Sequence, residues 1–185
     1  MKFWISEYLD KHPFQKKIAS WWLRNKFPIP EKIKRQMINQ IHTEMIIRLM
    51  DVVIKEGSLT LEKALKIHYQ IGQELADETK EILQPDPDKA KDLSYIIDFL
   101  HNLLDISGKK VIKAQNNEVI SHWYSCPISK RLKELHNGGG PYYCHLYQEM
   151  YKGVLNKINP KAFANDLTLT QSQGNEFCEL RTWIN

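Results

Sequence analysis

The chain has 185 residues, of which 42% are hydrophobic and 26% are charged. This composition and a mean hydropathy of −0.49 exclude an integral membrane protein and a disordered chain. Three cysteines exclude a disulfide framework, and their odd number favours a reducing compartment. Residues 1–13 carry charges where a signal peptide has an apolar run, so we expect no secretion. The composition therefore predicts a globular, cytoplasmic protein.

Positive charge is concentrated at the beginning of the chain. Residues 1–50 contain 10 basic and 4 acidic side chains, whereas residues 51–106 contain 6 and 12. A helix predicted over about 14–26 places apolar side chains on one face, namely Phe14, Ile18, Trp21 and Trp22. Such a helix usually packs on its own domain. Basic and aromatic residues together are also typical of a membrane surface, so peripheral membrane contact through 14–27 stays open. No nucleic-acid-binding motif is recognisable, and we expect no nucleic-acid partner.

The first half of the chain, 1–106, has the apolar period of helices. After the first of them, a second helix is predicted to end at Gly57, and Thr60 is a suitable N-cap for a third. Asp86 is the predicted N-cap of a fourth helix, which ends at Gly108. The first half is therefore predicted to be entirely helical.

The second half, 107–185, mixes strands and helices. Its predicted order is a hairpin of 109–115 with 118–123, helices over 127–135 and 142–156, and a hairpin of 167–171 with 177–184. The fold class is thus α+β, a helical N-terminal half followed by a ββααββ module with a small antiparallel sheet. Because the module alone has little apolar surface, we expect both halves to share one core in a single domain, 1–185.

Cys126 is the most informative candidate for chemistry. It follows a predicted strand and occupies the N-cap of the helix that begins at Pro127. The amides of a helix N-terminus favour a thiolate, and His122 or His145 would act beside it as general acid or base. These are the elements of a cysteine nucleophile. The structural alternative is a small cysteine packed at a strand–helix junction.

The second half also offers candidates for contacting a substrate. Tyr143, Tyr147 and Tyr151 share one stripe of a predicted helix, where they either pack the core or line a pocket with hydroxyl groups. Tyr124 and Cys144 lie beside the starts of predicted helices, and Cys178 lies on the core face of the last predicted strand. The predicted substrate-binding residues are Tyr124, Tyr143, Tyr147, Cys144 and Cys178.

Histidines lie on or beside the apolar stripes of three different predicted helices. His42, His68 and His101 would together hold a metal ion or a heme. The paired spacings HExxH and ExxH, which mark stronger metal sites, do not occur in the sequence. Core or boundary histidines with ordinary partners are the commoner outcome.

The order of elements in 107–185 resembles a known family. Cys126-Pro127 opens a helix, Asn159-Pro160-Lys161 follows the second helix, and 174–180 has the sequence GNEFCEL. Together these features are similar to the L-2-amino-thiazoline-4-carboxylic acid hydrolase-like family and, more distantly, to the small-molecule-binding domain named after 4-vinyl reductase. The resemblance implies a domain that encloses a small organic ligand, with Cys126 and Cys178 at its site.

These observations favour a hydrolase-like enzyme that acts on a small cyclic or carboxylated molecule. Cys126 would be its nucleophile or ligand, and tyrosines would form the walls of its pocket. Two alternatives stay open: a non-catalytic sensor or carrier of a small molecule, as vinyl-reductase-like domains are, and a metal or heme protein built on the helix histidines. The first hypothesis requires no cofactor, and the sequence leaves the oligomeric state open.

Overall fold

The computed structural model describes residues 4–24, 30–136, 141–164 and 169–185. The chain forms two compact units, Met1–Arg48 and Leu49–Asn185. The boundary between them lies within helix α3 (Glu31–Lys55).

The first unit contains helices α1 (Trp4–Asp10) and α2 (Pro13–Arg24) and the first part of α3. α2 confirms the helix predicted over 14–26 for its described part, whereas residues 25 and 26 lie outside the described residues. An ion pair of 2.6 Å between Lys16 of α2 and Asp10 of α1 joins the two helices. Because this pair is exposed, it contributes only about 1 kcal/mol or less.

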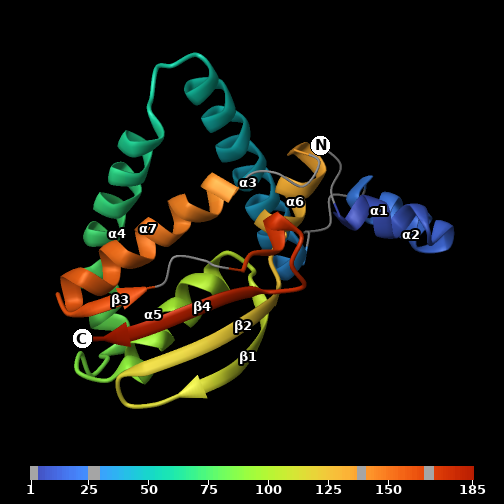
Figure 1. The fold of residues 1–185 in the computed structure, drawn as a ribbon. Helices are drawn as coiled ribbons and strands as arrows, with labels where there is room; N and C mark the ends of the chain where they lie inside the picture. Colours follow the sequence, from blue (N-terminus) through green and yellow to red (C-terminus); the bar gives the residue numbers. More distant parts are fainter. Residues whose placement is uncertain (1–3, 25–29, 137–140, 165–168) are drawn as a thin grey trace. The chain divides into compact units, whose positions relative to one another are not determined.

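The second unit confirms the predicted α+β architecture (Figure 1). Its strands form one antiparallel sheet in the order β1-β2-β4-β3. Two helices, α4 and α5, precede the first hairpin, and two more, α6 and α7, separate the strand pairs. The bounds are α4 (Leu61–Leu83), α5 (Ala90–Leu103), β1 (Ser107–Ala114), β2 (Glu118–Ser125), α6 (Pro127–His136), α7 (Pro141–Ile158), β3 (Ala162–Ala164), the 3-10 turn η1 (Gln171–Gln173) and β4 (Cys178–Ile184).

Helices α4 and α7 approach each other at two glycines. A Cβ atom added at Gly72 would lie 2.0 Å from the carbonyl oxygen of Met150. One added at Gly153 would lie 2.1 Å from the carbonyl oxygen of Tyr69. Only a residue without a Cβ atom fits at either position, so backbone contact at these glycines sets how closely α7 packs on α4.

The sheet has two different faces. α5 packs against β1, β2 and β4 and covers one face. Val119, Trp123 and Leu180 point to this face and are at most 5% exposed. His122 and Glu179, which are paired across β2 and β4, lie at alternate positions and point to the other face. The covered face therefore carries the core of the second unit.

Two boundaries of α5 differ from the prediction. The helix begins at Ala90 rather than directly after Asp86. The Asp86 carboxylate instead accepts a hydrogen bond of 3.1 Å from the backbone N–H of Asp88, which makes a local turn. The helix ends at Leu103 and not at Gly108, which lies in β1 with a φ of +74°. Gly108 thus lies at the start of the strand, in a left-handed backbone conformation that favours glycine.

The partner of the last strand also differs from the prediction. β4 pairs with β2 and β3, whereas the stretch predicted as its hairpin partner, 167–171, contributes a backbone hydrogen bond of 2.9 Å from the Glu179 N–H to the Leu169 carbonyl. The described part of that stretch has no strand, while residues 167 and 168 lie outside the described residues. Thr170 and Ser172 are buried there with their hydroxyl oxygens 2.9 Å apart. Local hydrogen bonds of such side chains compete with strand pairing, and here they accompany a 3-10 turn.

Candidate ligand-binding cavity

A cavity of about 50 Å³ lies between helices α5, α6 and α7 and the covered face of the sheet. This volume is several times what one water molecule needs. Most of the lining is apolar or aromatic, and the residues come from both halves of the sequence. They are His101, Ile106, Trp123, Cys126, Ile128, Ser129, Cys144, Tyr147, Gln148, Tyr151, Cys178 and Leu180.

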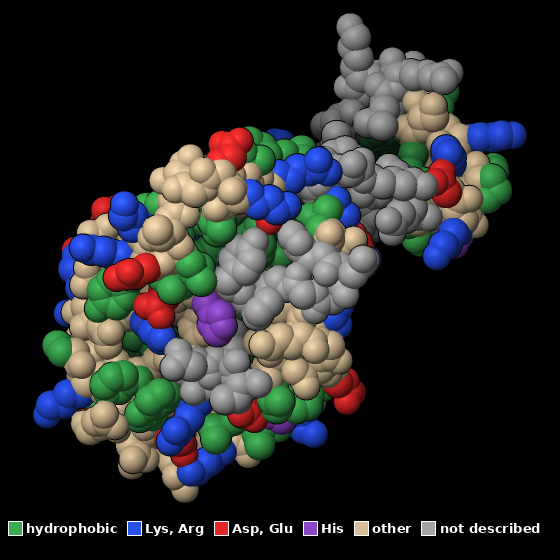
Figure 2. Space-filling view, turned by 45° about the horizontal axis from the view of Figure 1, so that its top comes forward, with side chains coloured by type: hydrophobic (Ala, Val, Ile, Leu, Met, Phe, Trp, Pro, Cys, Tyr) green, Lys and Arg blue, Asp and Glu red, His purple; other side chains and the backbone are tan. Residues whose placement is uncertain are grey.

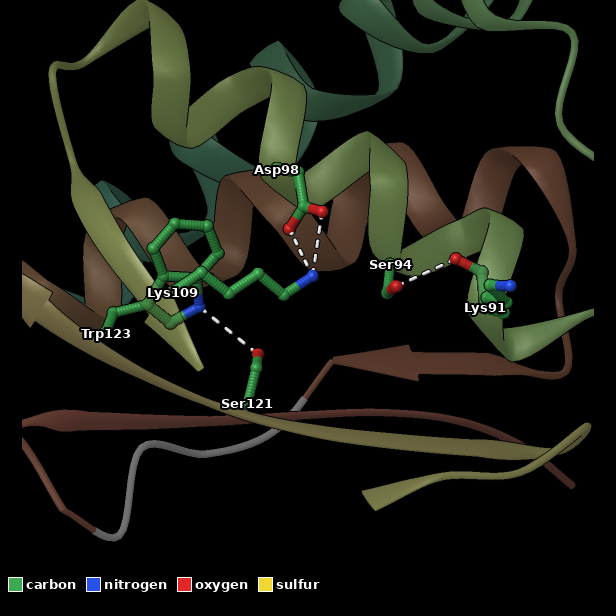
Figure 3. Close-up of polar contacts among 6 residues, drawn as sticks. All are labelled: Lys91, Ser94, Asp98, Lys109, Ser121 and Trp123. Carbon is green, nitrogen blue, oxygen red and sulfur yellow. Dashed lines mark hydrogen bonds and ion pairs between the residues drawn. The ribbon is translucent and has the colours of Figure 1, made fainter. Parts of the chain in front are cut away.

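Three aromatic rings form one wall of the cavity. His101 of α5 meets Trp123 of β2 edge to face, with ring centroids 4.2 Å apart, and its ring lies 5.2 Å from that of Tyr151 of α7. The indole N–H of Trp123 donates a hydrogen bond of 3.2 Å to the Ser121 hydroxyl (Figure 3). Because its single polar atom has a partner, Trp123 presents only apolar surface to the cavity.

An ion pair between helix and sheet lies beside this wall. The ammonium group of Lys109 in β1 lies 2.7 Å from both carboxylate oxygens of Asp98 in α5 (Figure 3). The same ammonium group lies 5.6 Å from the centre of the Trp123 ring. These contacts hold α5 against the edge of the sheet and so fix the position of His101.

Three residues of the lining carry buried polar atoms that lack a hydrogen-bond partner among the described residues. Within the described part of the chain, the His101 Nδ1, Ser129 Oγ and Tyr151 Oη atoms make no hydrogen bond. These residues are 7%, 1% and 4% exposed. A buried polar atom without a partner costs about 1–3 kcal/mol.

His101 is held in its neutral form. Burial, together with the positive charge of Lys109, lowers the pKa of its imidazole from 6.5 to about 3. At neutral pH one ring nitrogen therefore donates a hydrogen bond and the other accepts one. His101 can consequently bind a hydroxyl or a carbonyl group, but it supplies no positive charge for an anion.

All three cysteines line the cavity. The Cys126 sulfur accepts a hydrogen bond of 3.4 Å from the backbone N–H of Ser129, in the first turn of α6. The Cys144 sulfur lies 3.2 Å from the Ser172 hydroxyl, and the Cys178 sulfur accepts a bond of 3.3 Å from the Gln171 N–H. Each thiol therefore has a polar contact: Cys126 with the first turn of α6, and Cys144 and Cys178 with the 3-10 turn η1.

Burial keeps the three thiols protonated. It raises the pKa of Cys126 to about 11, and it raises the pKa of Cys144 and of Cys178 as well. The backbone N–H groups of Ser129 and Gln171 act in the opposite direction on Cys126 and Cys178, but burial outweighs them. Burial at Cys126 thus favours the thiol over the thiolate that its place at a helix N-terminus predicts. The field of the helix N-terminus is local, and it is smaller than the cost of removing the charged sulfur from water.

The tyrosines of the cavity are uncharged too. Burial raises the pKa of Tyr147 to about 12 and the pKa of Tyr151 well above 10. Every titratable group that lines the cavity is thus neutral at physiological pH. The arrangement suits a neutral, mainly apolar molecule, because an ionised group would lose its hydration without gaining a charged partner.

The structure brings together only some of the residues predicted from the sequence. Cys126, Cys144, Cys178 and Tyr147 line the cavity, whereas His122 does not. His122 lies on the other face of the sheet, stacked on the Phe177 ring at 3.8 Å.

The predicted pairing of Cys126 with His122 is therefore not formed. The Nε2 atom of His122 lies 3.0 Å from a carboxylate oxygen of Glu179 on the same outer face. A shift of one residue along a strand moves a side chain to the opposite face, and the sequence alone does not show on which side a strand is covered.

Three further candidates also lie outside the cavity lining. Tyr124 is 38% exposed, and its ring lies 5.7 Å from that of Phe177. Tyr143 is buried, but its hydroxyl donates a hydrogen bond of 2.7 Å to Asp51 and so serves packing. His145 is half-buried on α7 and does not contribute to the lining.

The three histidines proposed for a metal site have different surroundings. His42 is exposed on α3, and the His68 ring donates a hydrogen bond of 2.9 Å to the Ala64 carbonyl in α4. Of the three, only His101 lines the cavity. No group of three or more His, Cys, Asp or Glu side chains able to hold a metal ion occurs among the described residues. The three helix histidines are thus not assembled into such a group.

Sequence reasoning missed the polar atoms of the cavity. Ser129 and Gln148 lie on the inner sides of α6 and α7 and are each 1% exposed. The signal for Ser129 was its place three residues after Cys126 in the same helical turn. Gln148 follows Tyr147 in a helix with an apolar face, where a polar residue alone indicates nothing about burial.

Comparisons with known proteins support the fold. No protein-family model and no curated protein matches the chain. Among solved structures, the trafficking protein particle complex subunit 3 from Naegleria fowleri, covalently bound to palmitic acid, matches with a TM-score of 0.58 and 14% identity. That match covers 81% of this chain and 96% of the other.

A second match is the phenol-responsive sensory domain of the transcription activator PoxR, determined with phenol. Its TM-score is 0.60 at 10% identity, over 77% of this chain and 74% of the other. At such identities the likeness shows a shared α+β fold and nothing finer. Neither match is to the thiazoline hydrolase-like family that the motifs of 107–185 resemble, so the comparisons lend that family no support.

The described helices are too short or too polar to span a membrane. Within the described ranges, none combines the length and the apolar character needed to cross a bilayer.

Proposed function

We propose that this protein binds a small, neutral and mainly apolar molecule with one polar group, and that it acts as a sensor or carrier of that molecule. The observation that carries the proposal is the cavity itself. Its lining is mainly apolar and aromatic, and three of the lining residues, His101, Ser129 and Tyr151, carry buried polar atoms without a hydrogen-bond partner in the described part of the chain. Apolar walls with a few convergent polar groups are typical of small-molecule sites.

The structural neighbours add support from another direction. One of them holds palmitic acid and the other holds phenol, according to their descriptions. Both ligands are mainly apolar, and phenol carries the single neutral hydroxyl group that this cavity suits. A ligand of this general chemistry would place its apolar part against Trp123 and Leu180 and its polar end near His101 and Tyr151.

The first experiment is a native mass spectrum of the full-length protein as purified, followed by calorimetric titration with three probes of similar size. The probes are p-cresol, toluene, which lacks the hydroxyl group, and benzoate, which is charged. We expect p-cresol to bind most tightly and benzoate least, because the cavity offers hydrogen bonds but no positive charge. If none of the three probes binds and no ligand is retained on purification, the proposal is wrong.

A matched pair of variants tests where the ligand sits. Tyr151→Phe removes a hydroxyl that has no partner within the described part of the chain, so the fold should keep its stability. Its preference for p-cresol over toluene should fall by roughly tenfold, the worth of one hydrogen bond. Tyr95→Phe, at a tyrosine that is 47% exposed on α5, should change neither stability nor preference. An unchanged preference in Tyr151→Phe would place the polar end elsewhere.

A cysteine-dependent hydrolase is the second candidate, because Cys126 lines the cavity. Its support is weaker: burial raises the pKa of the Cys126 thiol to about 11, and neither His122 nor His145 lines the cavity. Cys126→Ala separates the two candidates. A binding protein still binds p-cresol in this variant, with an affinity altered only by the smaller side chain in the lining, whereas a hydrolase that turns over an identified substrate loses that turnover.

A further inference from the structure

Helix α2 of the first unit exposes an apolar stripe. Phe14, Ile18, Trp21 and Trp22 follow the helical period and are 74%, 48%, 58% and 40% exposed. Figure 2 shows hydrophobic and basic side chains together on the surface of the N-terminal helices. Large exposed aromatic side chains at this spacing are more than the scattered apolar residues of an ordinary surface.

The same helix is basic. Its 12 residues include Lys16, Lys17 and Arg24 and no acidic residue. The whole first unit, residues 1–48, contains 10 basic and 4 acidic side chains, a formal charge of +6. The exposed aromatic stripe therefore lies within the most positively charged part of the chain.

We propose that α2 docks this protein on the surface of an anionic lipid bilayer. The interfacial region of such a bilayer has both an apolar layer and a negative surface. Its acyl boundary accepts the side chains of Phe14, Ile18 and Trp21, and tryptophan in particular suits the headgroup level. Its negative headgroups attract Lys16, Lys17 and the other cations of the unit. The helix lies in the plane of the surface, with its apolar stripe inward.

The bilayer fits these observations better than other partners. A nucleic acid would satisfy the positive charge but offers no continuous apolar layer for an aliphatic side chain such as Ile18. A second copy of the same unit would cover the apolar stripe but would bring another charge of +6 beside the first. Charge complementarity together with apolar insertion thus selects the anionic membrane surface.

The test is sedimentation of the full-length protein with phosphatidylcholine vesicles, with and without phosphatidylserine. We expect binding to the phosphatidylserine vesicles and a marked loss of binding when phosphatidylserine is omitted or salt is raised. Lys16→Gln/Lys17→Gln should weaken binding by roughly thirtyfold, since each cation near the surface contributes about a factor of five. Phe14→Ser/Trp21→Ser should abolish insertion while leaving the circular dichroism spectrum unchanged.

Matched controls on the second unit keep the test specific. Tyr95→Ser removes an aromatic side chain of similar exposure, and Lys66→Gln/Lys130→Gln removes two exposed positive charges. Both controls should sediment like the unchanged protein. The proposal is overturned if no binding to anionic vesicles occurs, or if the control variants lose as much binding as the α2 variants. It is also overturned if Phe14→Ser/Trp21→Ser instead abolishes a dimer seen without lipid, or binding to single-stranded nucleic acid.

Discussion

The cavity of the second unit and the α2 surface of the first unit differ in which groups lie in an unfavourable environment: polar atoms in the cavity and apolar side chains on α2. In the cavity, polar atoms such as His101 Nδ1 and Tyr151 Oη are surrounded by apolar walls and have no hydrogen-bond partner among the described residues. On α2, apolar side chains such as Phe14 and Trp21 are exposed to water. Each region therefore holds groups that are in an unfavourable environment in the isolated chain.

The comparison teaches what kind of molecule each region would accept. A buried polar atom gains most from a small neutral molecule that fits among apolar walls and offers a hydroxyl or carbonyl group. An exposed aromatic stripe beside lysines gains most from an extended apolar layer with a negative surface. The two regions thus predict two separable activities, and changes in one should leave the other intact.

The largest expected effect concerns the scaffold that holds α7 in place. Gly153→Ala would put a Cβ atom 2.1 Å from the Tyr69 carbonyl oxygen, so α4 and α7 must move apart. We expect a loss of about 3 kcal/mol in the free energy of unfolding, measured with urea, and a loss of ligand binding. Vesicle binding through α2 should survive wherever the protein is still folded.

A glycine outside this crossing is the control. Gly57 has a φ of +70° but nothing within 4 Å of an added Cβ atom. Gly57→Ala should therefore cost only about 1 kcal/mol, the penalty of the left-handed backbone. Equal losses for Gly57→Ala and Gly153→Ala would show that close packing of α4 on α7 is not what limits the substitution.

The next effect is a dependence of stability on pH that arises in the cavity. His101 has a pKa of about 3 in the folded chain and 6.5 as its ordinary value, so the unfolded state binds more protons between these limits. Stability is therefore fully present above pH 6.5 and is lost as the pH falls toward 3. Between pH 7 and pH 5 the loss should be about 2 kcal/mol.

His101→Leu isolates this contribution. The variant lacks the titrating group, so its unfolding free energy should fall by about 2 kcal/mol less than that of the unchanged protein over the same interval. The carboxylates titrate equally in both proteins and cancel in the difference. Parallel pH profiles for the two proteins would mean that His101 is not held neutral by burial.

The first hairpin and the helices were predictable because their signals are local. The alternation on either side of Asn116-Asn117 gave the hairpin of β1 and β2 in nearly its observed bounds. The second hairpin was wrong, because the same alternation near Thr170 is overridden by buried hydroxyl groups and a 3-10 turn. The close approach of α4 and α7 at Gly72 and Gly153 could not be predicted, because the role of a glycine within a helix depends on the partner helix.

The sequence indicated which cysteines belong to the candidate site but not their protonation state. Cys126, Cys144 and Cys178 were named as site residues and do line one cavity. Their protonation depends on burial by α5, α7 and the sheet, and no local pattern encodes that burial. His101 and Tyr151 meet only in the folded chain, so sequence spacing did not place the two at one site.

The smallest expected effect on stability comes from serine substitutions on α2. It tests directly whether the α2 surface differs from the cavity region in not being needed for folding. Phe14 is 74% exposed and Trp21 is 58% exposed, so replacing either by serine removes little buried surface. Each substitution should change the free energy of unfolding by no more than about 0.5 kcal/mol, as is usual for surface positions. Urea unfolding followed by circular dichroism measures this directly. A loss of 2 kcal/mol or more would mean that these side chains stabilise the folded chain itself and are not held available for a membrane surface.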